Sequence, residues 1–302
     1  MISSIVLLGL VILMALVFLP VLITYLKGMR RIFVVLQQVC IIIYLSLTIV
    51  HISHFIKPSA LDLHKVFGGS AKHANPISLG IGRQLLDFFK FFFYFEYYFF
   101  SLMQTVDLYQ MICQPFHYES FSTFRNIAKL AFVGSGICFL LAIEPLIETV
   151  VFFHAFGISI EAIVELKDFF LNIRIYTVVK LICAKAVYAL IAGKLAYDIR
   201  QKLNESSAMQ SNKQRESAHE NLFRFNLIPL FVNILLIGHD IPTLKFLFNE
   251  INDCSLNHTE PILILISATS FTLTSFSYSI GYIVFFPKIR AAIQCRQCKC
   301  TN

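Results

Sequence analysis

Charged residues are scarce in this chain of 302 residues, of which only 14% are Asp, Glu, Lys or Arg. Hydrophobic residues account for 57% and the mean hydropathy is +0.71, so the composition is not that of a water-soluble protein. This balance largely excludes soluble enzymes and predicts a membrane protein. We interpret the net charge of +7 first as a topology signal, and we expect no nucleic-acid partner.

Catalytic and repeat signatures are also missing. The sequence contains no P-loop, HExxH, GxSxG or paired Cys-His arrangement in a plausible context, and no internal repeat of the kind that many transporters carry. Cys40, Cys138 and Cys183 lie in apolar segments, whereas Cys254 is alone in its loop, so no disulfide framework is expected. We therefore expect neither enzyme activity nor a cofactor or metal site.

Seven apolar blocks have about the 20 residues that a helix needs to cross the roughly 30 Å hydrocarbon layer. They cover residues 5–26, 32–56, 85–106, 127–151, 175–197, 222–247 and 262–286. The blocks predict an all-α fold, a seven-transmembrane helix bundle, in one domain over residues 1–290 with a short cytoplasmic tail over residues 291–302. Charged residues interrupt the segment 152–170, which we expect to form an interfacial helix outside this count.

The basic residues predict the orientation of the bundle. Lys27, Arg30 and Arg31 directly follow the first block, which places that turn in the cytoplasm and the N-terminus outside. The first block lacks a basic n-region and an obvious cleavage site, so we expect a retained helix rather than a signal peptide. Lys and Arg are about twice as frequent on the proposed inner side, which supports the same orientation.

Two kinds of covalent modification follow from this orientation. Asn257 opens an Asn-His-Thr sequence in the third outer loop and is therefore a predicted glycosylation site, whereas Asn204 opens Asn-Glu-Ser in a cytoplasmic loop. Cys295, Cys298 and Cys300 follow basic residues at the end of the last block. We expect them to be palmitoylated, and we consider zinc binding less favoured because a fourth ligand is missing.

The block over residues 85–106 holds the predicted ligand-binding face. Its polar residues recur at helical intervals of four and three: Lys90, Tyr94, Tyr97, Ser101 and Gln104. A charge at membrane depth is costly unless it faces the bundle interior, water or a partner, so this stripe is a functional hypothesis. A local ion pair between Lys90 and Asp87, three residues earlier, is the alternative, and the sequence leaves both open.

Two further polar positions complete the candidate set. Glu96 projects away from the stripe, and we expect Lys180 or Lys185 of the 175–197 block to be its partner. His239 lies with Asp240 near the outer end of the 222–247 block, where it is either part of a pocket mouth or simply solvated.

The sequence that follows the polar stripe resembles a known family motif. Its residues are Asp107, Leu108, Tyr109, Ile112, Cys113, Pro115 and Tyr118. This run resembles the Asp-Arg-Tyr region of rhodopsin-like G-protein-coupled receptors, although Leu108 stands in place of the arginine. The Phe-rich blocks, the missing Trp and the closing Tyr282, Pro287 and Arg290 look like the nematode serpentine chemoreceptor superfamily and, within it, the class XA branch. The last block lacks an Asn-Pro-x-x-Tyr sequence.

The resemblance implies a chemosensory receptor in the plasma membrane, including that of sensory cilia, that binds an external small-molecule cue and signals to a heterotrimeric G protein. The residues that it assigns to G-protein coupling are Asp107, Leu108, Tyr109, Pro115 and Arg224. From the residues alone, a solvated helix end is the favoured interpretation of Asp107, and the resemblance reverses this preference. A small-solute transporter or channel is the alternative function, and a structural polytopic protein without a ligand is a third.

Overall fold

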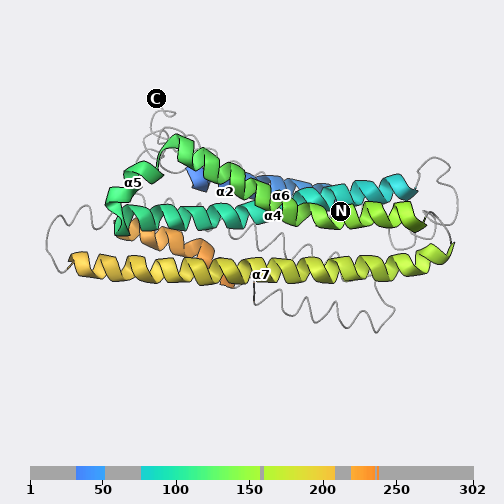
Figure 1. The fold of residues 1–302 in the computed structure, drawn as a ribbon. Helices are drawn as coiled ribbons and strands as arrows, with labels where there is room; N and C mark the ends of the chain where they lie inside the picture. Colours follow the sequence, from blue (N-terminus) through green and yellow to red (C-terminus); the bar gives the residue numbers. More distant parts are fainter. Residues whose placement is uncertain (1–31, 52–75, 157–159, 208–218, 235–236, 238–302) are drawn as a thin grey trace, which may run out of the picture.

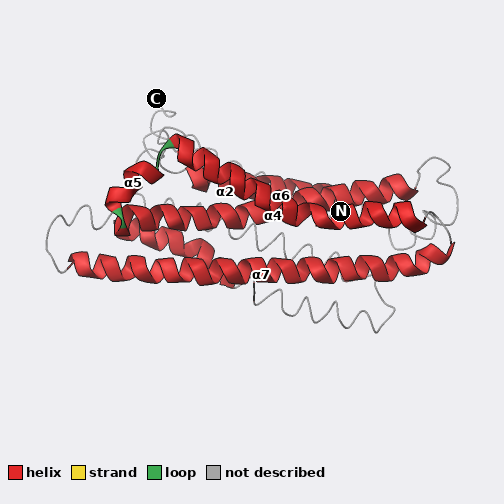
Figure 2. Cartoon of the chain, viewed as in Figure 1, coloured by secondary structure: helices red, strands yellow, loops and turns green. Residues whose placement is uncertain are grey.

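The computed structural model describes residues 32–51, 76–156, 160–207, 219–234 and 237. These residues are helical apart from short turns, and no strand occurs among them (Figure 2). The labelled helices are α2 (Ile32–His51), α4 (Pro76–Cys113), α5 (Pro115–Phe121), α6 (Phe124–Phe156) and α7 (Ile160–Ser207). Residues 219–234 form a further helix. The expected all-α fold is therefore confirmed for the part of the chain that the structure describes.

Helix α4 lies at the centre of this arrangement. It packs against α2, α6 and α7, so that α2 and α6 lie along one side of it and α7 runs along the other (Figure 1). The interior is mostly aromatic where these helices meet: Phe33, Tyr44, Tyr94, Tyr97, Tyr98, Phe100 and Tyr188 belong to one buried cluster. Rings of this size bury much apolar area with few rotatable bonds, which suits the contact surface between long helices.

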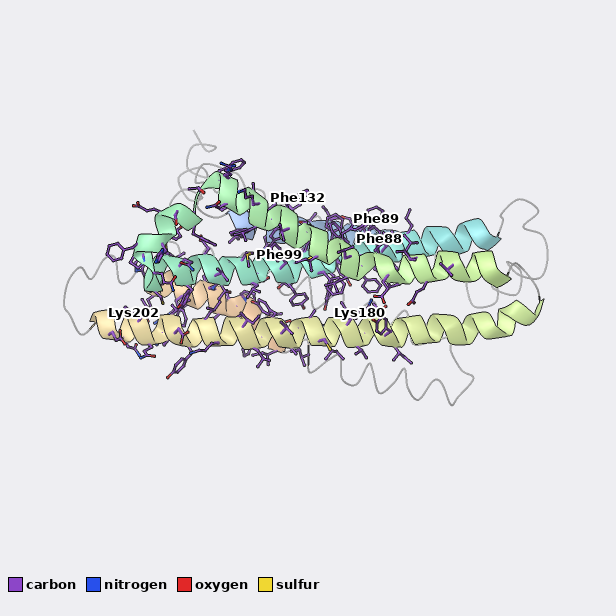
Figure 3. The ribbon with its side chains drawn as sticks, viewed as in Figure 1. Phe88, Phe89, Phe99, Phe132, Lys180 and Lys202 are labelled. Atoms are coloured by element: carbon purple, nitrogen blue, oxygen red, sulfur yellow. The ribbon has the colours of Figure 1, made fainter. Side chains whose placement is uncertain are left out.

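The contact between α4 and α6 depends on a glycine. A Cβ atom at Gly134 of α6 would lie 2.0 Å from Cζ of Phe99, far inside van der Waals contact. Figure 3 shows Phe99 directed from α4 toward α6. The absence of a side chain at Gly134 thus allows the phenyl ring to lie against the α6 backbone. At Gly136, one half-turn further, a Cβ would meet nothing within 4 Å.

The turn after α4 is determined by a proline. Pro115 is the first residue of α5, where its fixed φ suits a helix start and its missing N–H costs no hydrogen bond. Gln114 interrupts the helical path with φ of −133°, while its backbone N–H still donates to the Gln110 carbonyl at 3.0 Å. The chain therefore leaves α4 at Cys113 and re-enters a helix at Pro115.

Two described helices are long and apolar enough, by length and composition, to cross a membrane. They are Phe124–Glu148 within α6 and Ile175–Glu205 within α7, and Ile32–Thr48 of α2 is a shorter apolar helix. Large apolar side chains on the first two are exposed, for example Phe132 at 82% and Leu190 at 74%, as expected for surfaces that face lipid (Figure 3). The first and seventh predicted blocks lie outside the described residues.

The prediction for residues 152–170 is corrected by the structure. Instead of a separate interfacial helix, residues 160–170 are the first turns of α7, which continues unbroken for 48 residues, or about 72 Å. The physical reason is local, because residues 160–174 contain neither Gly nor Pro and charged side chains do not interrupt a backbone hydrogen-bond ladder. Helix α4 likewise begins at Pro76, nine residues before the predicted block.

Candidate functional site

The predicted polar stripe lies inside the bundle. Lys90, Tyr94, Tyr97 and Ser101 are all buried, and Ser101 has no exposed surface. Gln104, the last member of the stripe, is only half-buried. The helical spacing in the sequence therefore identified four residues that are buried along α4, although this central helix is enclosed on more than one side and Glu96, off the stripe, is buried as well.

Helix α2 contributes polar residues to this site that the sequence reasoning missed. The side-chain amide of Gln37 donates to Ser101 Oγ at 2.5 Å, and Ser101 Oγ donates in turn to the Tyr97 carbonyl at 2.7 Å. Gln38 and Thr48 of α2 are fully buried as well. The available signal was the occurrence of two glutamines in an otherwise apolar block, since buried amides in such a block need partners inside the protein.

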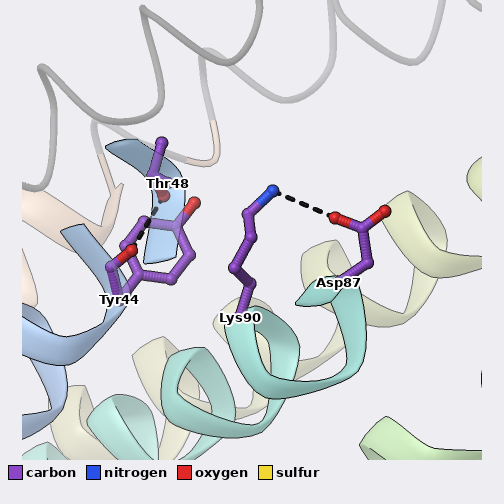
Figure 4. Close-up of polar contacts among 4 residues, drawn as sticks. All are labelled: Tyr44, Thr48, Asp87 and Lys90. Carbon is purple, nitrogen blue, oxygen red and sulfur yellow. Dashed lines mark hydrogen bonds and ion pairs between the residues drawn. The ribbon is translucent and has the colours of Figure 1, made fainter. Parts of the chain in front are cut away.

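Lys90 is both buried in the bundle and paired with Asp87, so its position agrees with both interpretations. Its Nζ lies 3.1 Å from Asp87 Oδ1, one turn earlier on α4, so the local ion pair is present. Figure 4 shows Tyr44 and Thr48 of α2 on one side of Lys90 and Asp87 on the other. Lys90 is thus directed into the bundle and paired within its own helix, which reduces the cost of burying its charge.

A group of tyrosines connects α4 to α7. Tyr98 Oη donates to Tyr94 Oη at 3.3 Å, and the Tyr98 ring lies edge-on to Tyr188 of α7 with centroids 5.8 Å apart. Lys185, only 2% exposed, places Nζ 5.4 Å from the centroid of the Tyr94 ring. Asn233, on the helix over residues 219–234, donates to the Lys185 carbonyl at 3.1 Å. Three helices therefore meet around one cation and several phenol groups.

The prediction that Lys180 is the partner of Glu96 is wrong. Glu96 accepts a hydrogen bond from Ser135 of α6 at 2.5 Å and one from the Cys40 thiol of α2 at 3.5 Å. Lys180 instead pairs with Glu144 of α6, its Nζ lying 2.5 Å from Oε2. Glu96 is directed to the side of α4 that α2 and α6 cover, so its neighbours are neutral donors.

At its Cys113 end, α4 meets α7 and the helix over residues 219–234 in an apolar cluster. The buried members of this Leu108 cluster are Leu108, Ile199, Leu203 and Phe223. Tyr109, Ile112 and Cys113 pack against it. The structure therefore brings two of the predicted coupling residues, Leu108 and Tyr109, to the place where the ends of three helices join.

The other predicted coupling residues lie around this cluster. Asp107 is half-buried on α4, and Pro115 begins α5. Arg224 pairs with Glu220 on its own helix, Nη2 to Oε1 being 2.7 Å, and Arg200 of α7 lies 3.6 Å from the same oxygen. Hydrogen bonding from Arg224, with a smaller contribution from Arg200, lowers the pKa of Glu220 below its ordinary value.

The ionisation of Cys113 depends on its packing against the Leu108 cluster. Burial raises the pKa of its thiol above the ordinary value, and the nearby Asp198 carboxylate raises it further. Because the thiolate is the reactive form, both access and ionisation of this cysteine depend on the closed arrangement of the helix ends.

Several predicted sites lie outside the described residues: His239, Asn257, Cys295, Cys298 and Cys300. Within the described ranges, no group of three or more His, Cys, Asp or Glu side chains is placed to hold a metal ion.

No protein-family model matches this sequence, and no curated protein matches it. The function of the site is therefore inferred from its own residues alone. A buried polar face and a buried apolar cluster occupy successive parts of the same helix, α4. Residues of α2 and α7 contact the polar face, and residues of α7 and the helix over residues 219–234 complete the cluster.

Proposed function

We propose that this chain is a seven-transmembrane G-protein-coupled chemosensory receptor of the plasma membrane, with its N-terminus outside and its tail over residues 291–302 inside. It binds an external small-molecule cue and transmits a rearrangement of its helices to a heterotrimeric G protein. The observation that carries this proposal is the pairing, on α4, of a buried polar stripe with the Leu108 cluster at the Cys113 end.

The physical argument is one of differential affinity. A cue that binds the polar stripe of one helix arrangement better than that of another shifts the population toward the first. If that arrangement also opens the Cys113 end, a G protein gains contacts there only when the cue is bound, and the two sites are coupled. The resemblance of residues 107–118 to the Asp-Arg-Tyr region supports the same assignment of the two ends.

Lys90→Met tests the ligand site. The substitution keeps most of the side-chain volume and removes the charge, so we expect the cue response to fall by about tenfold or more. The measurement is second-messenger output in cells that express the chain and are exposed to a panel of small metabolites and odorants, with surface level measured in parallel. Lys194→Met is the matched control, because Lys194 also pairs with an acid on its own helix but its side chain is 70% exposed.

The double variant Lys90→Met/Asp87→Asn separates binding from folding. A loss of surface expression in Lys90→Met that the double variant restores arises from the uncompensated Asp87 carboxylate. We expect the cue response of the double variant to remain low. A normal response in this variant would show that the pair is only structural and would remove Lys90 from the ligand site.

A small-solute transporter or channel is the second candidate, favoured by the buried charges Glu96 and Lys185, since charges at membrane depth also mark solute pathways. Uptake of labelled metabolites into vesicles that contain the purified chain distinguishes the two. Uptake above that of empty vesicles, without cue-dependent nucleotide exchange on a G protein, would replace the receptor proposal.

A further inference from the structure

Side chains of three helices gather around the turn of α7 that follows Lys185. The centroid of the Tyr94 ring on α4 lies 5.4 Å from Lys185 Nζ, and the rings of Tyr98 and Tyr188 have centroids 5.8 Å apart. Asn233, on the helix over residues 219–234, donates to the Lys185 carbonyl at 3.1 Å. Because a helical carbonyl points toward the C-terminus of its helix, this bond places the Asn233 amide near the level of Tyr188. We refer to Tyr94, Tyr98, Lys185, Tyr188 and Asn233 as the Lys185 site.

Two polar atoms of the Lys185 site are buried without a hydrogen-bond partner among the residues that the structure describes. They are Tyr188 Oη and Asn233 Oδ1, and the two residues are 3% and 1% exposed. Thr105 of α4 lies near the Tyr188 hydroxyl but outside hydrogen-bonding geometry, and its own hydroxyl donates to the Ser101 carbonyl at 3.1 Å. Buried polar groups are normally paired, because an unmade hydrogen bond leaves the desolvation of the group uncompensated. The two atoms therefore point to a bound molecule that supplies the missing partners.

The missing partners define the chemistry of that molecule. The Tyr188 hydroxyl is able to donate to an acceptor, whereas the Asn233 carbonyl oxygen only accepts and needs a donor. The bond from Asn233 Nδ2 to the Lys185 carbonyl determines which end of the amide is the oxygen. Lys185, 2% exposed, adds a positive charge that favours an anionic acceptor. Lys90, one turn before Tyr94, pairs with Asp87, so we assign the anion to Lys185.

We propose that the Lys185 site binds a small hydroxy acid. The carboxylate of the acid accepts hydrogen bonds from Lys185 and Tyr188, and its hydroxyl donates to Asn233 Oδ1. The carbon chain of the acid contacts the rings of Tyr94 and Tyr98. Binding itself does not depend on whether the chain is a receptor or a transporter, whereas the identification of the acid as the external cue rests on the proposed function.

Equilibrium dialysis tests the site with three radiolabelled probes, each against the full chain in detergent micelles and against protein-free micelles. Lactate carries both the carboxylate and the hydroxyl. Propanoate has the same chain length and charge but no hydroxyl, and propane-1,2-diol has the hydroxyl but no charge. We expect lactate to bind at least about fivefold more tightly than either analogue, because each analogue lacks one of the paired groups. Lactate binding that equals propanoate binding, or that does not exceed the blank, would overturn the proposal and leave ordered water as the partner of both atoms.

Tyr188→Phe tests the unpaired hydroxyl. The substitution should weaken lactate binding by about three- to tenfold. Without lactate it should not lower the midpoint of thermal unfolding, because it removes an unpaired buried group and no hydrogen bond within the protein. A lower midpoint with unchanged binding would show that the hydroxyl is purely structural and would remove it from the site. Tyr197→Phe is the matched control, since Tyr197 lies on the same helix but is 65% exposed, and it should leave lactate binding unchanged.

Two further variants assign the groups of the acid. Asn233→Leu should abolish the preference for lactate over propanoate, because the acceptor for the hydroxyl is lost. Lys185→Met should abolish the preference for lactate over propane-1,2-diol, because the positive charge is lost. Each preference compares two probes on the same protein sample, so a partial loss of folded protein does not affect the ratio. Unchanged preferences in both variants would overturn the assignment of these side chains.

A second readout separates this inference from the proposed function. Lactate applied to cells that express the chain should raise second-messenger output, and Lys185→Met should reduce that response. Lactate binding without any response would retain the site and refute the acid as the cue. A response to another metabolite, with no lactate binding, would overturn the site and retain the receptor function.

Discussion

The close contact between Phe99 and Gly134 gives the sharpest test of the packing around α4. A Cβ atom at position 134 would lie 2.0 to 2.3 Å from the end of the phenyl ring, whereas carbon atoms in contact are about 3.5 to 4.0 Å apart. Gly134→Ala therefore forces the ring out of a site that it shares with two buried clusters. Overpacking of this kind costs about 1 to 3 kcal/mol.

Gly136→Ala is the internal reference for this prediction. Alanine stabilises a helix relative to glycine by up to about 1 kcal/mol, and this gain applies equally at both positions. At position 136 no clash opposes it, because a Cβ there meets nothing within 4 Å. The difference between the two variants thus isolates the clash, and we expect Gly134→Ala to be less stable than Gly136→Ala by about 1 to 3 kcal/mol.

The assay is thermal unfolding of the purified chain in detergent, followed by the reaction of buried Cys40 and Cys138 with a fluorogenic maleimide. Gly134→Ala should unfold several degrees below Gly136→Ala. Phe99→Leu removes the ring, so in that background the penalty at position 134 should largely disappear. Equal midpoints for the two alanine variants would show that Phe99 does not lie against Gly134 and would contradict the α4 to α6 packing.

Three further predictions concern topology, coupling and the pH dependence of stability. Asn257→Gln should remove an endoglycosidase-sensitive mass, and loss of such a mass on Asn204→Gln would instead invert the proposed orientation. Asp107→Ala and Tyr109→Ala should each reduce cue-driven nucleotide exchange while ligand binding is retained, and unchanged exchange in both would remove the main local support for the family resemblance. Because the folded-state pKa of Glu220 is lowered, its contribution to stability is complete above its ordinary value of 4.5 and is lost as the pH falls through the folded-state value. Glu220→Gln should abolish this dependence in acid titrations of unfolding, an effect on the order of 0.5 kcal/mol for an exposed pair.

Local patterns in the sequence were sufficient to predict the apolar parts of the described helices and that the polar stripe of α4 is buried. The intervals from Lys90 to Ser101 follow the turn of a helix, and this periodicity is independent of what packs against it. The blocks over residues 127–151 and 175–197 likewise lie within α6 and α7. The seven-span count and the orientation remain predictions, because they include residues outside the described ranges.

Partners across helices were less predictable. A helical pattern shows that Glu96 lies off the stripe, but not that α4 turns this side toward Ser135 and Cys40 rather than toward a lysine. That choice depends on the rotation of one helix relative to its neighbours, which side-chain packing determines. The partner of Gln37 was unpredictable for the same reason, because a glutamine in an apolar block indicates a buried amide but not that Ser101 accepts its hydrogen bond.

Helix α4 is well suited to connect its two functional ends. From position 90 to position 108 it rises through 18 residues, or about 27 Å, without a Gly or Pro at which it would bend. By contrast, α6 contains Pro145 and a glycine at its crossing with α4. A stiff helix does not absorb a displacement of the polar stripe locally, so the displacement reaches Leu108. Under the proposed receptor function, the free energy that a cue supplies at the stripe is therefore transmitted along α4 to the buried apolar contacts of Leu108.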